Sequence, residues 1–353
     1  MFKQKSVVFA VLLSALLVAL VATAVGAAPN RQAEVKLSLD QDAFGPTQAV
    51  IVHVTISNPG NSAVKVLKWF TPAEDVEEAL FKVTRDGQPV AYIGAIYKRP
   101  AAAAADYVTL KPGASLSRDV DISAYYDFSV SGNYSISYDV SAWNLYSEKA
   151  NGWFNAAMSS EKVDFYAEGR AAKTPENPVP SAVSGTTSFN KCTTAQQTTG
   201  TSARAQASTY AADALAYLNS NKQGARYTTW FGVYSSSRYT TVKTHFNAIS
   251  SAMDTAPVTL DCSCRKKYYA YVYPTQPYTI YLCSVFWTAP LKGTDSQAGT
   301  LIHEMSHFNV VAKTDDYVYG QSGAKSLAIS NPDNAINNAD NHEYFAENTP
   351  SLP

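Results

Sequence analysis

The 353-residue sequence has no excess of positive charge and few histidines. Its 28 Lys and Arg residues are balanced by 29 Asp and Glu residues, so the net charge is −1. This balance gives no sign of a surface for binding polyanions, and nucleic acid is therefore not expected as a partner. Only five histidines are present, so two that fall close together in the sequence are informative.

Long apolar runs are absent except at the N-terminus. Lys3 and Lys5 precede an apolar run from Val7 to about Val25, and small residues end the segment. This layout predicts a secretory signal peptide over residues 1–27, cut after Ala27, and hence a secreted, extracellular protein. An uncleaved anchor is the alternative, since about 19 apolar residues nearly span a bilayer. We expect no membrane contact once the signal peptide is removed.

The N-terminal half lacks cysteine and has the texture of a β-protein. Its apolar and polar residues alternate in short runs that are separated by turn signals such as NPGN, RDGQP and KPGA. Six or more such runs predict an all-β immunoglobulin-like sandwich over residues 28–166. The runs are VKLSLDQD, AVIVHVTISN, VKVLKWF, ALFKVTRDGQPVAYIG, YVTLKPGASLSRDVDIS and GNYSISYDV.

In the C-terminal half the apolar residues no longer alternate with polar ones. Residues 167–187 are rich in Pro, Ser, Gly, Ala and Thr, and they predict an exposed linker where proteases cut. Beyond it the apolar residues recur at helical spacing, so residues 188–353 are expected to form a mainly helical domain. We expect helices over 203–221, 239–253 and 295–312, the last with Asp295 or Ser296 as N-cap, and a β-hairpin over 268–287.

All four cysteines lie in this second half. An even number in an exported protein suggests disulfides, and four cysteines allow three pairings. A Cys262–Cys264 bridge would close a very tight ring, which leaves two pairings open. Of these we favour Cys192–Cys262 with Cys264–Cys283. A zinc site of four thiolates would need a CxxC spacing, which the sequence CSC does not offer.

Two of the five histidines lie four residues apart in the stretch HEMSH. On a helix, His303 and His307 share one face, so both imidazoles can reach one metal ion. Glu304 follows the first histidine, and its carboxylate can reach a metal-bound water without being a ligand. The alternative is a chance match, which we expect in on the order of one chain in a hundred. Two histidines leave a tetrahedral zinc short of a third protein ligand.

HEMSH followed by KTDDYVYG resembles the aspzincin metallopeptidases, the group of deuterolysins and peptidyl-Lys metallopeptidases. Their second motif reads G-T-x-D-x-x-Y-G, in which the Asp is the third zinc ligand. Thr314, Asp316, Tyr319 and Gly320 match this motif, and Lys313 departs from its first Gly. The resemblance covers about residues 188–353, includes the Cys192/Cys262 and Cys264/Cys283 spacings, and implies an α+β zincin-like catalytic domain.

The resemblance implies one Zn²⁺ per chain, bound by His303, His307 and Asp316, with Asp315 outside the ligand set. The expected reaction is peptide-bond hydrolysis by a metal-activated water, with Glu304 as general base. Tyr319 is expected to stabilise the oxyanion. The protein is therefore predicted to be a hydrolase, a secreted zinc metalloendopeptidase that acts on protein or peptide substrates.

Substrate specificity is expected to lie in NNADNHEYFAEN. Asp340 and Glu343 are three residues apart and would share a helix face. Lysine-specific members of the family use an Asp and a Glu at this spacing, so the resemblance implies an S1′ pocket that prefers lysine. If these acids form only a solvated surface, the enzyme is a broad-specificity, deuterolysin-like neutral protease. A second alternative is a β-sandwich binding protein or adhesin with a structural zinc, although such sites usually have four protein ligands.

The N-terminal half is expected to be the propeptide of a monomeric zymogen. Because it has no cysteine, it cannot inhibit a zinc site by a cysteine switch, and it must block the cleft sterically or assist folding. If the enzyme cuts before lysine, the Ala172–Lys173 and Asn190–Lys191 bonds are candidate self-processing sites.

Overall fold

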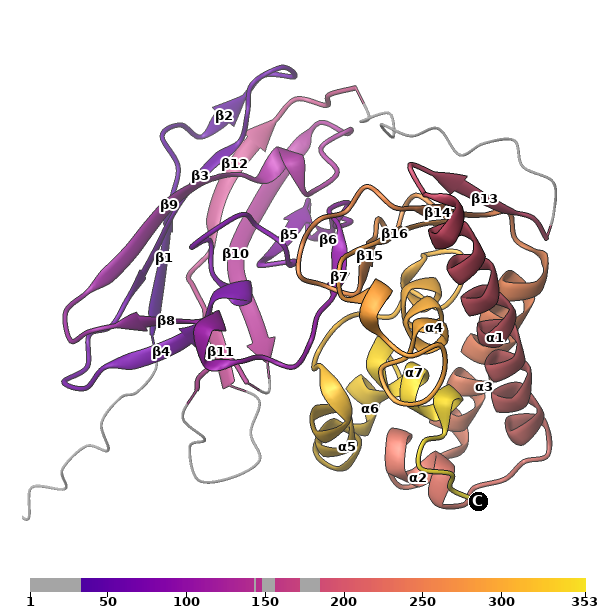
Figure 1. Cartoon of the computed structure of the whole chain (residues 1–353). Helices are drawn as coiled ribbons and strands as arrows, with labels where there is room; N and C mark the ends of the chain where they lie inside the picture. Colours follow the sequence, from indigo (N-terminus) through magenta and orange to yellow (C-terminus); the bar gives the residue numbers. More distant parts are fainter. Residues whose placement is uncertain (1–32, 143, 148–155, 172–184) are drawn as a thin grey trace, which may run out of the picture.

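The computed structural model describes residues 33–353 apart from 143, 148–155 and 172–184. The predicted signal peptide (1–27), its cleavage site and the Ala172–Lys173 bond lie outside the described residues. Figure 1 shows a β-rich N-terminal half beside a C-terminal half that carries the helices. Among the helices of the described part of the chain, none combines the length and the apolar character needed to span a membrane.

The N-terminal half contains strands at all of the predicted runs. Three strands form one sheet in the order β1-β3-β9, a second has the order β2-β12-β10-β5-β6 with β11 added to β10, and β4 pairs with β8. Buried residues alternate along β3 and β10, and both strands contribute to one shared core. The strands are β1 (Glu34–Ser38), β2 (Ala43–Phe44), β3 (Ile51–Ser57), β4 (Val64–Leu67), β5 (Phe81–Arg85), β6 (Gln88–Pro89), β8 (Tyr107–Leu110), β9 (Ser115–Asp121), β10 (Gly132–Ala142), β11 (Ala156–Ser159) and β12 (Val163–Ala167). The immunoglobulin-like topology stays a prediction.

The C-terminal half mixes helices with a sheet larger than the predicted hairpin. The hairpin is confirmed as β15 and β16, which pair antiparallel, but β13 and β14 add two parallel strands. The elements are β13 (Thr187–Asn190), α1 (Thr194–Asn219), α2 (Ala225–Phe231), α3 (Ser236–Thr255), β14 (Val258–Asp261), β15 (Ala270–Val272), β16 (Thr279–Leu282), α4 (Gln297–His307), α5 (Gly320–Ser330), α6 (Pro332–Ala335) and α7 (Ala339–Glu347). The parallel strands were not predicted because VTLD and TSFN are too short to show a period.

Two predicted helix boundaries are wrong. Helix α1 begins at Thr194 rather than 203, because Thr193 and Gln196 form a capping box ahead of a first turn without an apolar period. Helix α4 starts after Ser296, as expected, but ends at His307 rather than 312. The chain then turns through Lys313, whose φ of 51° is the left-handed conformation that glycine adopts more readily.

Helix α4 lies inside the C-terminal half and is buried along its whole length. Its apolar residues Leu301, Ile302 and Met305 belong to the core of this half. The same burial encloses its polar residues, so His303 and His307 lie in the interior rather than at a surface. The helix is therefore a rigid support for whatever these side chains bind.

One strand of the N-terminal half leaves its own sheets. Strand β7 (Ile96–Lys98) pairs antiparallel with β15 and becomes the edge strand of the C-terminal sheet, in the order β13-β14-β16-β15-β7 (Figure 1). Tyr97 lies opposite Tyr271, and the amide of Tyr269 donates to the carbonyl of Lys98 at 3.0 Å. The two halves are thus joined by backbone pairing that the sequence did not predict.

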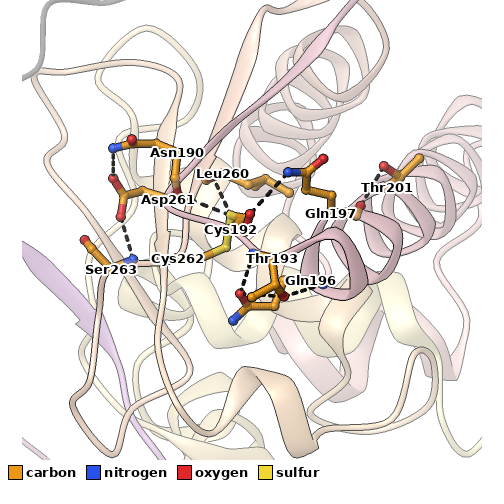
Figure 2. The surroundings of a disulfide bond; sticks show 10 residues. All are labelled: Asn190, Cys192, Thr193, Gln196, Gln197, Thr201, Leu260, Asp261, Cys262 and Ser263. Carbon is orange, nitrogen blue, oxygen red and sulfur yellow. Dashed lines mark hydrogen bonds between the residues drawn. A yellow bond between two sulfur atoms is a disulfide. The ribbon is translucent and has the colours of Figure 1, made fainter.

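Both favoured disulfides are present, and no described cysteine is free. Cys192 lies two residues after β13 and Cys262 directly follows β14, and Figure 2 shows this bridge beside the hydrogen-bonded side chains of Asn190 and Asp261. The second bridge joins Cys264 to Cys283 across the hairpin. The first bridge thus holds the start of the C-terminal half to its central sheet.

We predict that the two disulfides differ in their contribution to stability. The Cys192–Cys262 bridge closes a loop with a sequence separation of 70, and Cys264–Cys283 one of 19. Loop-closure entropy gives about 4 kcal/mol for the first and about 3 kcal/mol for the second. Calorimetry of the two paired Cys→Ser variants should show the larger fall in Tm for Cys192→Ser/Cys262→Ser. An equal or reversed order would contradict the entropic account.

Candidate active site

The two histidines of HEMSH converge on the carboxylate of Asp316. The Nε2 atom of His303 lies 3.3 Å from Asp316 Oδ1, and that of His307 lies 3.5 Å from Asp316 Oδ2. His307 Nδ1 is 2.9 Å from the carbonyl oxygen of Thr314, and a hydrogen bond donated to it leaves Nε2 free to be a ligand. The structure therefore brings together all three residues that were expected to bind the metal.

The loop that carries Asp316 is held at both ends. At its start, the amide of Thr314 donates to the carbonyl of Ser306 on α4. Further along, the side-chain oxygen of Asn338 accepts the amide hydrogens of Tyr317 (2.8 Å) and Val318 (3.2 Å). Asn338 was not predicted to have a role, because a lone asparagine before a helix carries no signal of a contact 20 residues away.

The loop ends at a glycine that links it to helix α7. Gly320 has a φ of 79°, a conformation that side chains other than glycine rarely adopt. Its amide donates to Asp340 Oδ2 at 2.6 Å. The glycine of the second motif thus connects the loop of Asp316 to one of the two acids that were expected to bind substrate.

The residues present fit a zinc ion. The ligand atoms of His303, His307 and Asp316 lie within 4.8 Å of one another, and all three residues are buried. Their Nε2 atoms and Asp316 Oδ1 make no hydrogen bond within the described protein. Burying such atoms without a partner costs free energy, and two imidazoles with one carboxylate are a usual ligand set for a zinc that keeps one open position.

Glu304 lies beside these residues as a buried carboxyl group. Neither of its oxygen atoms has a hydrogen-bond partner among the described residues. Burial raises the pKa of Glu304 to about 7, against the opposing effect of His303 and His307. A carboxyl group with this pKa can accept and release a proton near neutral pH, as a general base must.

Tyr319 lies between the two halves of the chain. Its hydroxyl is 3.1 Å from Asp316 Oδ2, 3.1 Å from Glu78 Oε1 and 2.9 Å from the carbonyl oxygen of Tyr97. It also accepts a hydrogen bond from the guanidinium of Arg99. The hydroxyl therefore reaches both a candidate metal ligand and a peptide carbonyl on strand β7.

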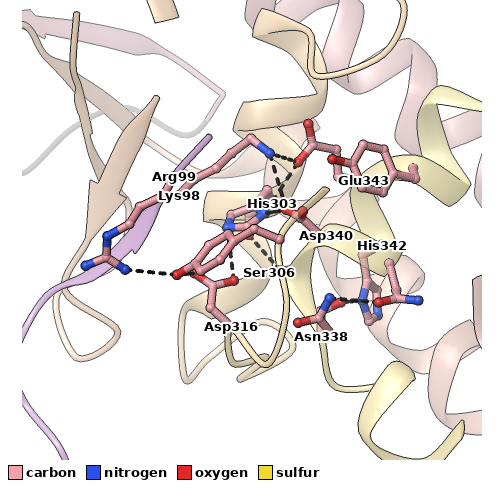
Figure 3. A network of polar contacts seen from close by, with 12 residues as sticks. Lys98, Arg99, His303, Ser306, Asp316, Asn338, Asp340, His342 and Glu343 are labelled. Carbon is pink, nitrogen blue, oxygen red and sulfur yellow. Dashed lines mark hydrogen bonds and ion pairs between the residues drawn. The ribbon is translucent and has the colours of Figure 1, made fainter. Parts of the chain in front are cut away.

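Asp340 and Glu343 share the inward face of α7 and form a pocket. The amine of Lys98 enters it and lies 3.3 Å from Asp340 Oδ1 and 2.5 Å from Glu343 Oε2 (Figure 3). The exposed fractions of the two acidic side chains are 1% and 0%, so they are not a solvated acidic face. Asp295 Oδ1 lies 3.8 Å from the same amine, a third acid that was considered only as a helix cap.

The pocket and the metal ligands are in direct contact. His303 Nδ1 lies 2.8 Å from Asp340 Oδ1 and 3.4 Å from Glu343 Oε2. A carboxylate next to the second ring nitrogen of a metal-binding histidine fixes the orientation of the ring. By contrast, Asp315 is exposed, and its backbone pairs with residues 337–339.

The chain is similar to several known proteins. Residues 216–347 match the model of the family of lysine-specific metallo-endopeptidases. An extracellular protease of Aeromonas hydrophila is 45% identical over 313 residues, which cover 87% of this chain and 90% of that protein. A peptidyl-Lys metalloendopeptidase of Grifola frondosa is 36% identical over 96% of this chain and 99% of its own length. One from Pleurotus ostreatus is 54% identical over 98% of its own length, which covers 46% of this chain.

We predict that Gly299 sets the distance between α4 and α7. A Cβ atom at this position would lie 2.1 Å from Glu347 Oε1 and 2.9 Å from Glu343 Oε1. Gly→Ala inside a helix normally stabilises by about 1 kcal/mol, whereas this overpacking should cost about 1–3 kcal/mol. Calorimetry of Gly299→Ala should therefore show a lower Tm. A raised Tm would mean that the acids move away without cost.

Proposed function

Because this chain belongs to the aspzincin family of lysine-specific metallo-endopeptidases, we propose that it is a zinc endopeptidase that cuts on the amino side of lysine. The observation that carries the lysine preference is the burial of a lysine amine between Asp340 and Glu343. A closed pocket with two carboxylates stabilises a cation and leaves an apolar side chain with two unpaired charges.

His303, His307 and Asp316 would hold the zinc ion. When bound, zinc polarises the scissile carbonyl and makes water more acidic. His307 is oriented by the carbonyl of Thr314, and His303 by Asp340. These contacts keep the Nε2 atoms directed at one point, so that the site is preorganised.

Glu304 moves the proton. Its carboxylate accepts a proton from the attacking water and passes it to the nitrogen of the leaving amine. Burial supports this role, because a carboxyl with a pKa of about 7 both accepts and donates near neutral pH. Glu304 itself makes no hydrogen bond with the described residues, so no protein group competes for its oxygens.

Tyr319 stabilises the oxygen of the scissile carbonyl. Its hydroxyl already lies 2.9 Å from a peptide carbonyl oxygen, that of Tyr97, which supports this role. A hydrogen bond to that oxygen becomes stronger as negative charge develops on it. The proximity of the hydroxyl to Asp316 keeps it next to the metal ligands.

The remaining parts of the chain support the proposal of a secreted zymogen. The division is a signal peptide (1–27), a propeptide (28–166), a processing linker (167–187) and a peptidase (188–353). The Pleurotus relative, matched over nearly its full length by under half of this chain, supports a peptidase that exists as a separate polypeptide. The name of the Aeromonas relative and the two disulfides support export.

Of the candidate processing bonds, Asn190–Lys191 is the less suitable. Asn190 is the last residue of β13 and pairs with Asp261 of β14. The amide of Cys262 also donates to the carbonyl of Asn190 at 2.9 Å. A cut here would detach β13 from the chain that needs it, so we propose that processing takes place upstream of Thr187.

We predict that Glu304→Gln abolishes peptidase activity without loss of metal. Removing a general base lowers kcat by about 10²–10⁴-fold, and the amide keeps the size of the side chain. Activity on a lysine-containing peptide and zinc content by atomic absorption measure both effects in the 185–353 segment, which keeps all of β13. A chelator should abolish wild-type activity, and added zinc should restore it. A variant that keeps its activity would exclude Glu304 as the base.

We predict that Asp340→Asn and Glu343→Gln each remove most of the preference for lysine. Losing one charge of a buried pair costs at least about 2 kcal/mol, or roughly 30-fold in kcat/KM for lysine substrates. Cleavage before a neutral residue should change little for Glu343→Gln, whereas Asp340→Asn should slow it as well, because Asp340 orients His303. Asp333→Asn, which alters an acid that is 79% exposed on α6, is the matched control. Equal losses for lysine and neutral substrates would leave a broad-specificity protease.

A further inference from the structure

The lysine in the pocket comes from the N-terminal half of the same chain. Strand β7 adds to the exposed edge of β15, as an extended peptide adds to a sheet. Lys98 inserts its amine between Asp340 and Glu343, and the preceding residue, Tyr97, directs its carbonyl oxygen at the hydroxyl of Tyr319. The Tyr97–Lys98 bond therefore lies where a bond before lysine would lie in a substrate.

The side chain of Lys98 is enclosed as well as paired. Its exposed fraction is 1%, and its amine lies 5.0 Å from the ring centre of Tyr269 and 5.9 Å from that of Tyr344. In Figure 3 the side chains of Lys98, the last residue of β7, and Arg99, the residue after it, extend in different directions. No room is left in the pocket for the lysine of another peptide.

The residue after Lys98 fastens this segment to its own domain. The guanidinium of Arg99 is buried and pairs with Glu77 and Glu78, while its Nη1 atom donates to the hydroxyl of Tyr319. Glu77 also pairs with Lys266 of the C-terminal half. Ion pairs thus hold this segment to the N-terminal half through Arg99, and hold the N-terminal half to the C-terminal half through Glu77 and Lys266.

We propose that residues 96–99 are an internal substrate mimic, through which the N-terminal half binds the active cleft and inhibits the peptidase in the intact chain. The inhibitory part of this proposal rests on the proposed function. The partner is chemically defined: an extended strand with a lysine at the position of the residue after the scissile bond. Tethering makes the mimic effective, because linked groups meet at an effective concentration in the millimolar range.

The same contacts explain why Lys98 inhibits rather than being consumed. Upstream of the bond, the amide of Ile93 donates to the carbonyl of Tyr125 within the N-terminal half. Downstream, Arg99 is held by Glu78. If the Tyr97–Lys98 bond were cut, both new ends would stay anchored to one folded domain beside the catalytic residues. The amine and the acid would then remain aligned for resynthesis of the bond.

A first experiment tests whether the amine of Lys98 is buried between Asp340 and Glu343, and it does not depend on peptidase activity. The full chain carrying Glu304→Ala, which cannot process itself, is labelled with acetic anhydride, and each lysine is followed by mass spectrometry. We expect Lys98 to react at least about tenfold more slowly than the exposed Lys111, because its exposed fraction is 1%. Adding Asp340→Asn and Glu343→Gln should raise the rate at Lys98 alone. Equal rates at Lys98 and Lys111 in the first protein would overturn the proposal.

A second experiment measures inhibition. The intact chain carrying Lys98→Met, which keeps the length of the side chain but not its charge, is compared with the wild type and with Lys111→Met. We expect its initial rate on a lysine-containing peptide to rise at least about tenfold, and that of Lys111→Met to stay at the wild-type value. Gel electrophoresis verifies that the chains are intact during the assay.

An unchanged initial rate for Lys98→Met would overturn the proposal, because Lys98 would then be only a structural contact. A lower rate would also overturn it, since Lys98 would then mark a processing bond. If the 185–353 segment, which keeps all of β13, is folded by circular dichroism and binds zinc but is inactive, the proposed function fails, and inhibition fails with it. The labelling result is independent of that outcome and still decides whether Lys98 fills the pocket.

Discussion

A buried carboxylate has to be paired or neutralised, and this requirement organises the centre of the protein. Four acidic side chains, Glu304, Asp316, Asp340 and Glu343, are buried within one small volume. The four side chains meet this requirement in three ways. Asp316 faces two imidazoles, Asp340 and Glu343 share the amine of Lys98, and Glu304 has a pKa raised by burial to about 7. One cluster thus contains a candidate metal ligand, a candidate proton carrier and a pair of acids that binds a cation, distinguished by their surroundings.

The rigidity of this cluster follows from the burial of α4 and from polar contacts at its edges. The N-cap Ser296 and the carboxyl of Glu347 fix the start of α4 to the end of α7, and Thr314 fixes the metal-binding loop to the end of α4. Asn338 then ties that loop to the start of α7. Because each contact joins two of the three elements, a shift in one would displace ligands and pocket together.

Local pattern predicted what lies on single elements. The spacing of His303 and His307 predicted their common face, and the structure places Asp316, which the resemblance named as third ligand, beside them. The helix that carries Asp340 and Glu343 was also expected. Lys98 was not, because it is separated from Asp340 by 242 residues and lies in a three-residue strand with no period of its own. Contacts of this kind depend on how two domains dock, which no local propensity encodes.

In the proposed function and inhibition, lysine specificity and latency are coupled because both depend on the same charges. The affinity for a substrate lysine would arise from Asp340 and Glu343, the two acids that contact Lys98. A substitution that lowers the proposed affinity for a substrate lysine would also weaken the binding of the N-terminal half to the peptidase. The additional charges at Arg99, Glu77 and Glu78 lie outside the pocket, so they can adjust the strength of inhibition without changing the preference for lysine. The domain interface, rather than the pocket, is therefore where latency can vary independently.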